Sequence, residues 1–143
     1  MKRPILSNDA GASNIVFASD IVPNVPGGDG IIHDNESFLV QWSAQNTGAA
    51  ASPAFTDLLV ISSVPEGCPG DDRKDHPVVY NSERDADNPQ DFLEGPLNPG
   101  QTGDLMQPSV GPFPAGSYRL TVTLAKDIAN VTLFTCIDIV PAN

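Results

Sequence analysis

One segment of the chain places an apolar residue at every second position and then stops at a turn. Between residues 37 and 45 one face of an extended strand would carry Phe38, Val40, Trp42 and Ala44, and the other would carry Gln41, Ser43 and Gln45. A period of two needs one buried side and one exposed side, as in an antiparallel sheet packed against a second sheet. Asn46 can bond its own backbone and Gly48 accepts a positive φ, which suits a strand end. The segment predicts a sandwich strand with Trp42 in the core.

Further apolar segments separated by turn-forming residues predict seven or eight strands. The expected strands are 14–22, 37–45, 54–63, 117–125 and 131–140, with shorter candidates at 31–33, 77–80 and 101–107. Fourteen prolines and twelve glycines oppose long helices. A length of 143 residues suits one domain. We therefore expect an all-β protein, with one immunoglobulin-like antiparallel β-sandwich over residues 14–143 and a flexible amino-terminal arm at 1–13.

The strand expected at 54–63 carries apolar residues on both faces. Leu59 and Ile61 share one face, and Leu58 and Val60 share the other. Either the strand is central and covered on both sides, or its outer face meets a partner.

The charge of the chain restricts its partners. Seven Lys and Arg oppose eighteen Asp and Glu, which gives a net charge of -11. Nucleic acids and anionic membranes attract cations, so neither is expected as a partner. No stretch approaches the roughly 20 apolar residues of a membrane-spanning helix, so membrane insertion is not expected. The apolar run after Lys2 and Arg3 ends at once, unlike that of a signal peptide.

A 31-residue stretch from Pro65 to Gly95 is longer than ordinary connections and is the best candidate for a functional loop. It holds nine of the eighteen acidic residues. The candidate binding residues are Asp71, Asp72, Asp75, Asp85, Asp87 and Asp91. Carboxylates at this density could bind Ca²⁺, and the weak calcium candidates are Asp85, Asp87 and Asp91. The spacing lacks the glycine and the glutamate of an EF-hand, and a solvated charged loop is the alternative. No cofactor is expected.

The remaining reactive residues do not form a catalytic pattern. The only histidines are His33 and His76, and no GxSxG sequence is present. We expect no catalytic residues and no enzyme activity. Cys68 and Cys136 lack the spacing of a zinc site. They form either a disulfide or two free thiols.

Several short segments resemble the CARDB-type domain, named for bacterial cell-adhesion-related proteins. The matching segments are 40–48, Ser52 with the strand from Phe55, 97–100, 114–118 and the residues Leu120, Val122, Leu124 and Asp127. The similarity covers roughly residues 36–140. It implies an immunoglobulin-like sandwich without a catalytic centre.

Two departures from the family pattern bear on function. Ile128, Ala129 and Asn130 replace the acidic, asparagine-rich turn that family members often carry after this aspartate, which argues against a ligand or calcium role there. The insertion at 65–95 is longer than the family pattern requires, so specificity is expected in that loop.

These features together predict a non-catalytic structural or binding module. It would attach to a larger assembly through its sheet faces, its edge strand and its arm. The leading prediction is a virion protein that decorates a phage capsid, with a trimer as the expected homo-oligomer. One alternative is the adhesion module of a bacterial surface protein that binds protein or glycan. Another is an accessory domain of a secreted enzyme. The expected location is the virion surface, or the cell surface and exterior.

Overall fold

A computed structural model describes residues 12–25, 28, 30–68, 70, 75–126 and 128–142. These residues form twelve short strands and two short helical segments. The strands are β1 (Ile15–Phe17), β2 (Val22–Asn24), β3 (Ile32–His33), β4 (Phe38–Gln41), β5 (Ala44–Asn46), β6 (Phe55–Thr56), β7 (Leu58–Ser63), β8 (Val78–Asn81), β9 (Leu93–Glu94), β10 (Ser109–Val110), β11 (Gly116–Leu124) and β12 (Val131–Val140). The helical segments are α2 (Ser82–Asp85) and the 3-10 turn η1 (Pro89–Phe92).

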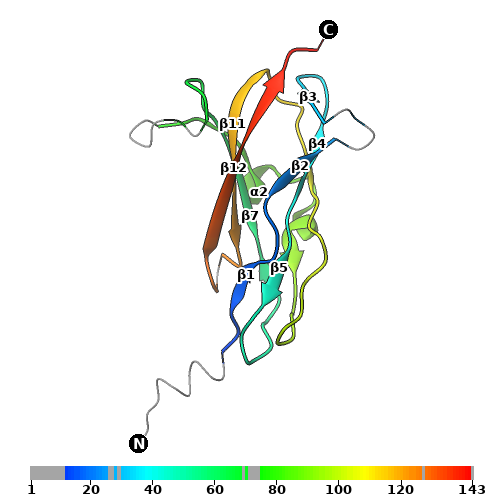
Figure 1. Ribbon diagram of the computed structural model, residues 1–143, viewed down its shortest axis with the longest axis vertical. Coiled ribbons are helices and arrows are strands. Elements are labelled where there is room, and N and C mark those ends of the chain that lie inside the picture. The colour runs from blue at the N-terminus through cyan, green and yellow to red at the C-terminus, as the bar shows by residue number, and fades with distance from the viewer. Residues whose placement is uncertain are drawn as a thin grey trace, which may run out of the picture.

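The strands form two layers of an elongated sandwich (Figure 1). One layer is a sheet in the order β3-β12-β11-β7-β8, in which only the β3–β12 pair is parallel. The other layer contains the sheet β10-β4-β2 and the pair β1-β5. Isolated bridges pair Trp42 with Met106 and Gln45 with Thr102, so the segment 101–107 runs beside the chain from Trp42 to β5. The predicted all-β sandwich is confirmed.

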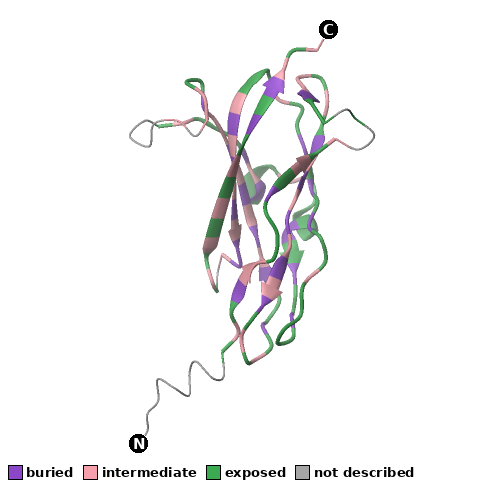
Figure 2. Cartoon of the chain, in the orientation of Figure 1, coloured by how far each residue is buried: buried purple, intermediate pink, exposed green. Residues whose placement is uncertain are grey.

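The core lies between the layers because the strands alternate as the sequence predicts. In β11, Tyr118, Leu120, Val122 and Leu124 are buried, and the residues between them are not (Figure 2). Trp42 is 0 % exposed, which confirms its predicted core position. On β7, Leu58 and Val60 are half-buried, so its outer face is neither fully covered nor fully exposed.

Three predicted strands are interrupted in the structure. Asp57 separates β6 from β7, and the predicted strands 14–22 and 37–45 each split into two shorter ones. At the latter break, the Ser43 N–H donates to the Ser19 side chain at 3.0 Å instead of to a neighbouring strand. The segment 101–107 holds only isolated bridges. A polar side chain thus replaces a ladder hydrogen bond at Ser43, and a search for apolar runs does not detect such a replacement. At Asp57 the backbone N–H donates to the Phe92 carbonyl.

The helical segments lie within the acidic stretch and were not predicted. Each follows an asparagine whose side chain caps its first turn. Asn81 accepts from the Glu83 N–H before α2, and Asn88 accepts from the Gln90 N–H before η1. Such short turns lack an apolar repeat, so only their caps mark them in the sequence. No helix among the described residues is long and apolar enough to cross a membrane.

Asn46 and Gly48 fix the beginning of the described chain. The Asn46 side chain accepts from the N–H groups of Asn14 and Gly48 and donates to the carbonyls of Ala50 and Leu97. A Cβ on Gly48 would lie 2.3 Å from the carbonyl oxygen of Ala12. Gly48 is therefore required by this close approach, and the positive φ expected from the sequence is not found there.

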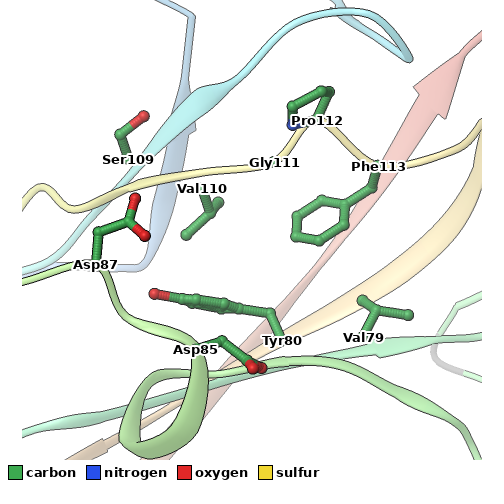
Figure 3. A pocket seen from close by; sticks show the side chains of 9 residues that line it. All are labelled: Val79, Tyr80, Asp85, Asp87, Ser109, Val110, Gly111, Pro112 and Phe113. Carbon is green, nitrogen blue, oxygen red and sulfur yellow. The ribbon is translucent and has the colours of Figure 1, made fainter.

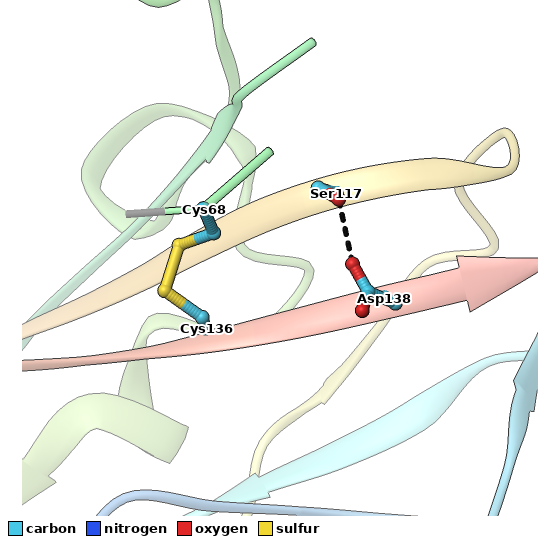
Figure 4. The surroundings of a disulfide bond; sticks show 4 residues. All are labelled: Cys68, Ser117, Cys136 and Asp138. Atoms are coloured by element: carbon cyan, nitrogen blue, oxygen red, sulfur yellow. Dashed lines mark hydrogen bonds between the residues drawn. A yellow bond between two sulfur atoms is a disulfide. The ribbon is translucent and has the colours of Figure 1, made fainter. Parts of the chain in front are cut away.

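Cys68 and Cys136 form a disulfide, which settles the alternative left open by the sequence (Figure 4). Their Cα atoms are 5.7 Å apart. The bond attaches the beginning of the acidic stretch to β12. Beside it, the Ser117 hydroxyl donates to Asp138 at 2.6 Å across β11 and β12.

Candidate functional site

A hollow of about 220 Å³ lies between the acidic stretch and the segment that follows β10 (Figure 3). From one side it is lined by Val79, Tyr80, Asp85 and Asp87, which belong to β8, α2 and the chain after α2. From the other side it is lined by residues 109–113, including Phe113. Two of the predicted binding residues thus lie in one hollow with two aromatic rings. We call this group the acidic pocket.

The acidic pocket carries a negative potential around Tyr80. Burial is the largest cause that raises the pKa of the Tyr80 phenol, and the charges of Asp85, Asp87 and Asp91 raise it further. All three carboxylates act in the same direction because each opposes a second negative charge at the phenolate. The phenol therefore stays protonated at neutral pH and can donate a hydrogen bond to a ligand.

Asp85 is held in place by its own hydrogen bonds. It accepts from the Asn81 N–H at 2.8 Å and from the Arg84 side chain at 2.9 and 3.0 Å. These contacts lower its pKa, with the hydrogen bond from Arg84 as the largest cause. Asp85 is thus ionised over the whole physiological range and has a fixed position.

Phe113 is supported by the core. Its ring lies 6.2 Å from the ring of Phe38 and 5.8 Å from that of Tyr118. Gly111, with φ of 90°, makes the turn that leads to it, in a region that disfavours other residues. The hydroxyl of Tyr118 donates to the Pro114 carbonyl at 2.6 Å. Phe113 therefore offers a fixed apolar side to the pocket.

The other predicted binding residues do not line this pocket. Asp75 is exposed, and Asp91 lines a neighbouring hollow that shares Ser109 with it. Asp71 and Asp72 lie outside the described residues. Within the described ranges, no three His, Cys, Asp or Glu side chains come together as metal ligands. Asp85, Asp87 and Asp91 therefore do not form a calcium site in this structure.

A second acidic group, Asp57 and Glu94, is buried beside the end of η1, where the Asp57 N–H donates to the Phe92 carbonyl. Asp57 accepts from the indole N–H of Trp42 and from the Ala125 N–H, both at 3.0 Å. Glu94 is only 8 % exposed, and neither of its oxygens has a hydrogen-bond partner. Burial, followed by the interaction with Asp57 and the charge of Asp104, raises the pKa of Glu94 to about 9. Because no hydrogen-bond geometry joins the two carboxyl groups, we attribute the effect to burial and to neighbouring charge.

The sequence interpretation missed three important residues of these two groups. Tyr80 ends the predicted strand 77–80, but nothing in the sequence shows that Phe113 lies opposite it. Asp57 has a clearer signal, since it is an acid inside an apolar strand. An acid in such a position is either exposed on an edge or buried with donors.

No family model matches the sequence, and no curated protein matches it. Among solved structures, the fold is similar to a CARDB domain from Pyrococcus furiosus that was solved in complex with di-metal ions. That similarity has a TM-score of 0.55 and 12 % identity, and it covers 98 % of this chain and 100 % of the other. The described residues offer no ligand set for such ions.

A β-glucosidase from Erythrobacter marinus contains a similar fold. The TM-score is 0.51 and the identity 14 %, over 90 % of this chain but only 16 % of the β-glucosidase chain. At these identities the likeness concerns the fold alone. The predicted resemblance to the CARDB-type immunoglobulin-like sandwich is thereby confirmed for the fold of this chain.

Proposed function

We propose that this protein is a non-catalytic module that attaches to a protein surface, and that its acidic pocket receives a cationic side chain of the partner. The observation that carries the proposal is the lining of the pocket, in which Asp85 and Asp87 lie beside the rings of Tyr80 and Phe113. Asp85 already accepts from Arg84 and Asn81, so the charge offered to a guanidinium or an ammonium group is mainly that of Asp87. The aromatic rings pack against the apolar part of such a group and against its charge. A lysine or arginine side chain matches both features.

The charge of the whole chain supports the same partner. A net charge of -11 favours encounter with a basic surface and repels an acidic one. The pocket itself is small, at about 220 Å³, which suits one side chain rather than a large ligand. The rest of the contact would be formed by the surfaces around it.

The proposal can be tested with small probes that carry only the relevant group. N-acetyl-arginine amide is titrated into the protein, and backbone amide shifts of Val110 and Gly111 are followed by NMR. N-acetyl-citrulline amide has nearly the same shape without the charge. We expect weak saturable binding of the arginine probe, none of the citrulline probe, and weaker binding as salt is added.

Asp87→Asn should weaken the arginine probe about tenfold, as expected for the loss of one charge-assisted contact. Asp75→Asn is the matched control, because Asp75 is an exposed acid that does not line the pocket. Equal binding of the two probes, or an equal loss in both variants, would disprove the proposed pocket.

The identity of the assembly stays a prediction. The phage capsid role, the trimer and the virion or cell-surface location depend on sequence interpretation, and no contact or comparison bears on them. Sedimentation of the protein with purified phage particles, and with intact bacterial cells, tests these predictions directly. Acidity and a single adhesion-type fold are compatible with either surface.

An accessory domain of a secreted enzyme is the second candidate. It is favoured by the β-glucosidase, in which a similar fold makes up a small part of a longer chain. An antibody against this sequence, applied to the native source, isolates the chain that carries it, and mass spectrometry of that chain would find no catalytic domain under the first proposal. Under the second it would find a catalytic domain in the same chain.

A further inference from the structure

One edge of the five-stranded sheet is open along most of β12. On its inner side, β12 pairs with β11 from Val131 to Ile139. On its outer side, the only partner among the described strands is β3, which pairs with Ile139 and Val140. The segment 131–138 therefore has backbone groups that no described strand pairs with (Figure 1).

The pairing register identifies those backbone groups. The Val140 carbonyl accepts from the Asp34 N–H on the β3 side, so Val140 directs its backbone groups outward. Backbone groups of a strand alternate between its two edges. Thr132, Phe134, Cys136 and Asp138 therefore direct their N–H and C=O groups toward the open edge.

This edge lacks the usual protection against another strand. Exposed edges normally carry lysine, proline or a bulge that prevents pairing. From Val131 to Ile137 the sequence VTLFTCI contains no charged residue and no proline, and it is rich in residues that favour strands. Phe134 is 51 % exposed. An unprotected edge of this kind is expected to be covered by an extended segment.

An apolar groove accompanies the open edge. Its far side is lined by Ile21, Val22 and Pro23 with Asp20 at their end, and its near side by Leu133, Phe134 and Thr135. Val22 is 49 % exposed. The groove gives room for the apolar side chains of an added strand, while the edge supplies its backbone hydrogen bonds.

The amino-terminal segment 1–11 fits this edge in length and chemistry. Extended, it reaches roughly 36 Å, and the open run of β12 is roughly 26 Å long. Ile5 and Leu6 are apolar, and Lys2 and Arg3 outnumber Asp9, so the segment is positive while the whole chain carries -11. A second β12 strand would instead bring two strongly negative chains together.

The anchoring of Ala12 favours an edge in another copy. The Ala12 carbonyl accepts from the N–H groups of Ala49 and Ala50, and the Asn14 carbonyl accepts from Thr47. The chain is thus held along the 46–50 segment at the end of the sandwich where β1 lies (Figure 1). To reach its own β12, the segment would have to reverse directly before this anchor.

We propose that residues 1–11 of one copy add as an antiparallel strand to the open edge of β12 in a neighbouring copy, along Thr132 to Asp138. The contact is heterologous, so it closes into a ring or continues into a chain of copies. The trimer predicted from the sequence is one such ring.

Sedimentation velocity of the full chain and of a variant that begins at Ala12 tests this proposal. We expect concentration-dependent association of the full chain and a monomer for the shortened chain. A synthetic peptide of residues 1–11 should bind the shortened chain and shift the amide signals of Thr132, Phe134 and Asp138. A scrambled peptide should not.

Phe134→Pro and Phe134→Ala form a matched pair of edge variants. Both remove the ring, but only proline removes the N–H that faces the open edge, and neither affects a hydrogen bond to β11. The proline variant should bind the peptide more weakly than the alanine variant, by up to about tenfold, as expected for the loss of one net hydrogen bond. Unchanged amide signals from β11 would verify that both variants fold.

Three outcomes would overturn the proposal. The first is association of the shortened chain, which would indicate contact between folded domains. The second is equal peptide binding by the two Phe134 variants. The third is a monomeric full chain whose β12 amide signals change on removal of residues 1–11, because the segment would then occupy its own edge.

Discussion

The acidic pocket and the buried pair Asp57 and Glu94 use the same residue types in opposite ways. In the pocket, Asp85 is exposed, bonded to Arg84 and ionised. In the interior, Glu94 is buried without a hydrogen-bond partner, and its pKa rises to about 9. Burial therefore determines whether a carboxyl group offers a charge to a partner or affects the stability of the fold.

The largest expected effect is a loss of stability when the surroundings of the buried Asp57 are changed. Trp42→Ala should lower the free energy of unfolding by about 3–5 kcal/mol, as for other large core truncations. The change also leaves the Asp57 carboxylate without the indole N–H that it accepts from. Urea unfolding measures the effect.

Trp42→Phe helps to separate the contribution of core packing from that of the hydrogen bond to Asp57. Phenylalanine keeps one ring beside Phe92 and much of the packing, but it removes the donor and leaves a small cavity where the second ring of the indole lay. It should cost about 1–3 kcal/mol, the range for a buried group left unpaired. A loss below about 1 kcal/mol in the alanine variant would contradict the core position of Trp42.

Glu94 should make the protein less stable as the pH rises. In the folded chain it keeps its proton up to a pKa of about 9, whereas in the unfolded chain it releases the proton near 4.5. Between these values the folded state binds more protons, so unfolding becomes easier with increasing pH. Glu94→Gln removes this dependence and should raise the stability at pH 7 by about 2–3 kcal/mol.

Urea unfolding of both proteins at pH 5, 7 and 8.5 checks this prediction. The two stability curves should be close at the lowest pH and should separate as the pH rises. Parallel curves would show that Glu94 titrates normally in the folded protein. Asp85 of the acidic pocket should contribute little to the difference, because its hydrogen bond from Arg84 lowers its pKa and it is already ionised in this range.

A substitution in the exposed acidic pocket should change the protein less than one in the buried group. Asp87→Asn should lower the pKa of Tyr80, because one of the charges that raise it is removed. The chain has two tyrosines, and the pKa of Tyr118 is raised by burial alone, so Tyr118 should not respond. Ultraviolet titration of the variant, with Tyr80→Phe to assign the signals, measures the change. Stability should change by less than about 0.5 kcal/mol.

The sequence predicts the sandwich strands better than it predicts the buried group around Asp57, and the reason is physical. The alternation around Trp42 and along β11 predicts the sandwich, because burial on one face of a strand imposes a period of two. The same reasoning does not predict the split at Asp57, since its hydrogen bonds come from Trp42 and Ala125, which are distant in the chain.

Only the acidic half of the candidate site was predicted from the sequence. The density of acids indicated the stretch from Pro65 to Gly95 and included Asp85 and Asp87. The opposite wall, with Phe113, belongs to a segment that the fold alone brings close. A pocket formed by two distant segments depends on the register of the sheets, and local composition does not contain that information.

The addition of calcium should have the smallest effect on the stability of the protein. Within the described residues, the carboxylates of Asp85, Asp87 and Asp91 do not gather around one point, and Asp85 already accepts from Arg84 and Asn81. A cation that binds only the folded state must raise the melting temperature. We therefore expect no shift in melting temperature between millimolar Ca²⁺ and chelator, beyond a screening effect that Mg²⁺ reproduces. A rise specific to Ca²⁺ and lost in Asp91→Asn would show that these acids rearrange around an ion.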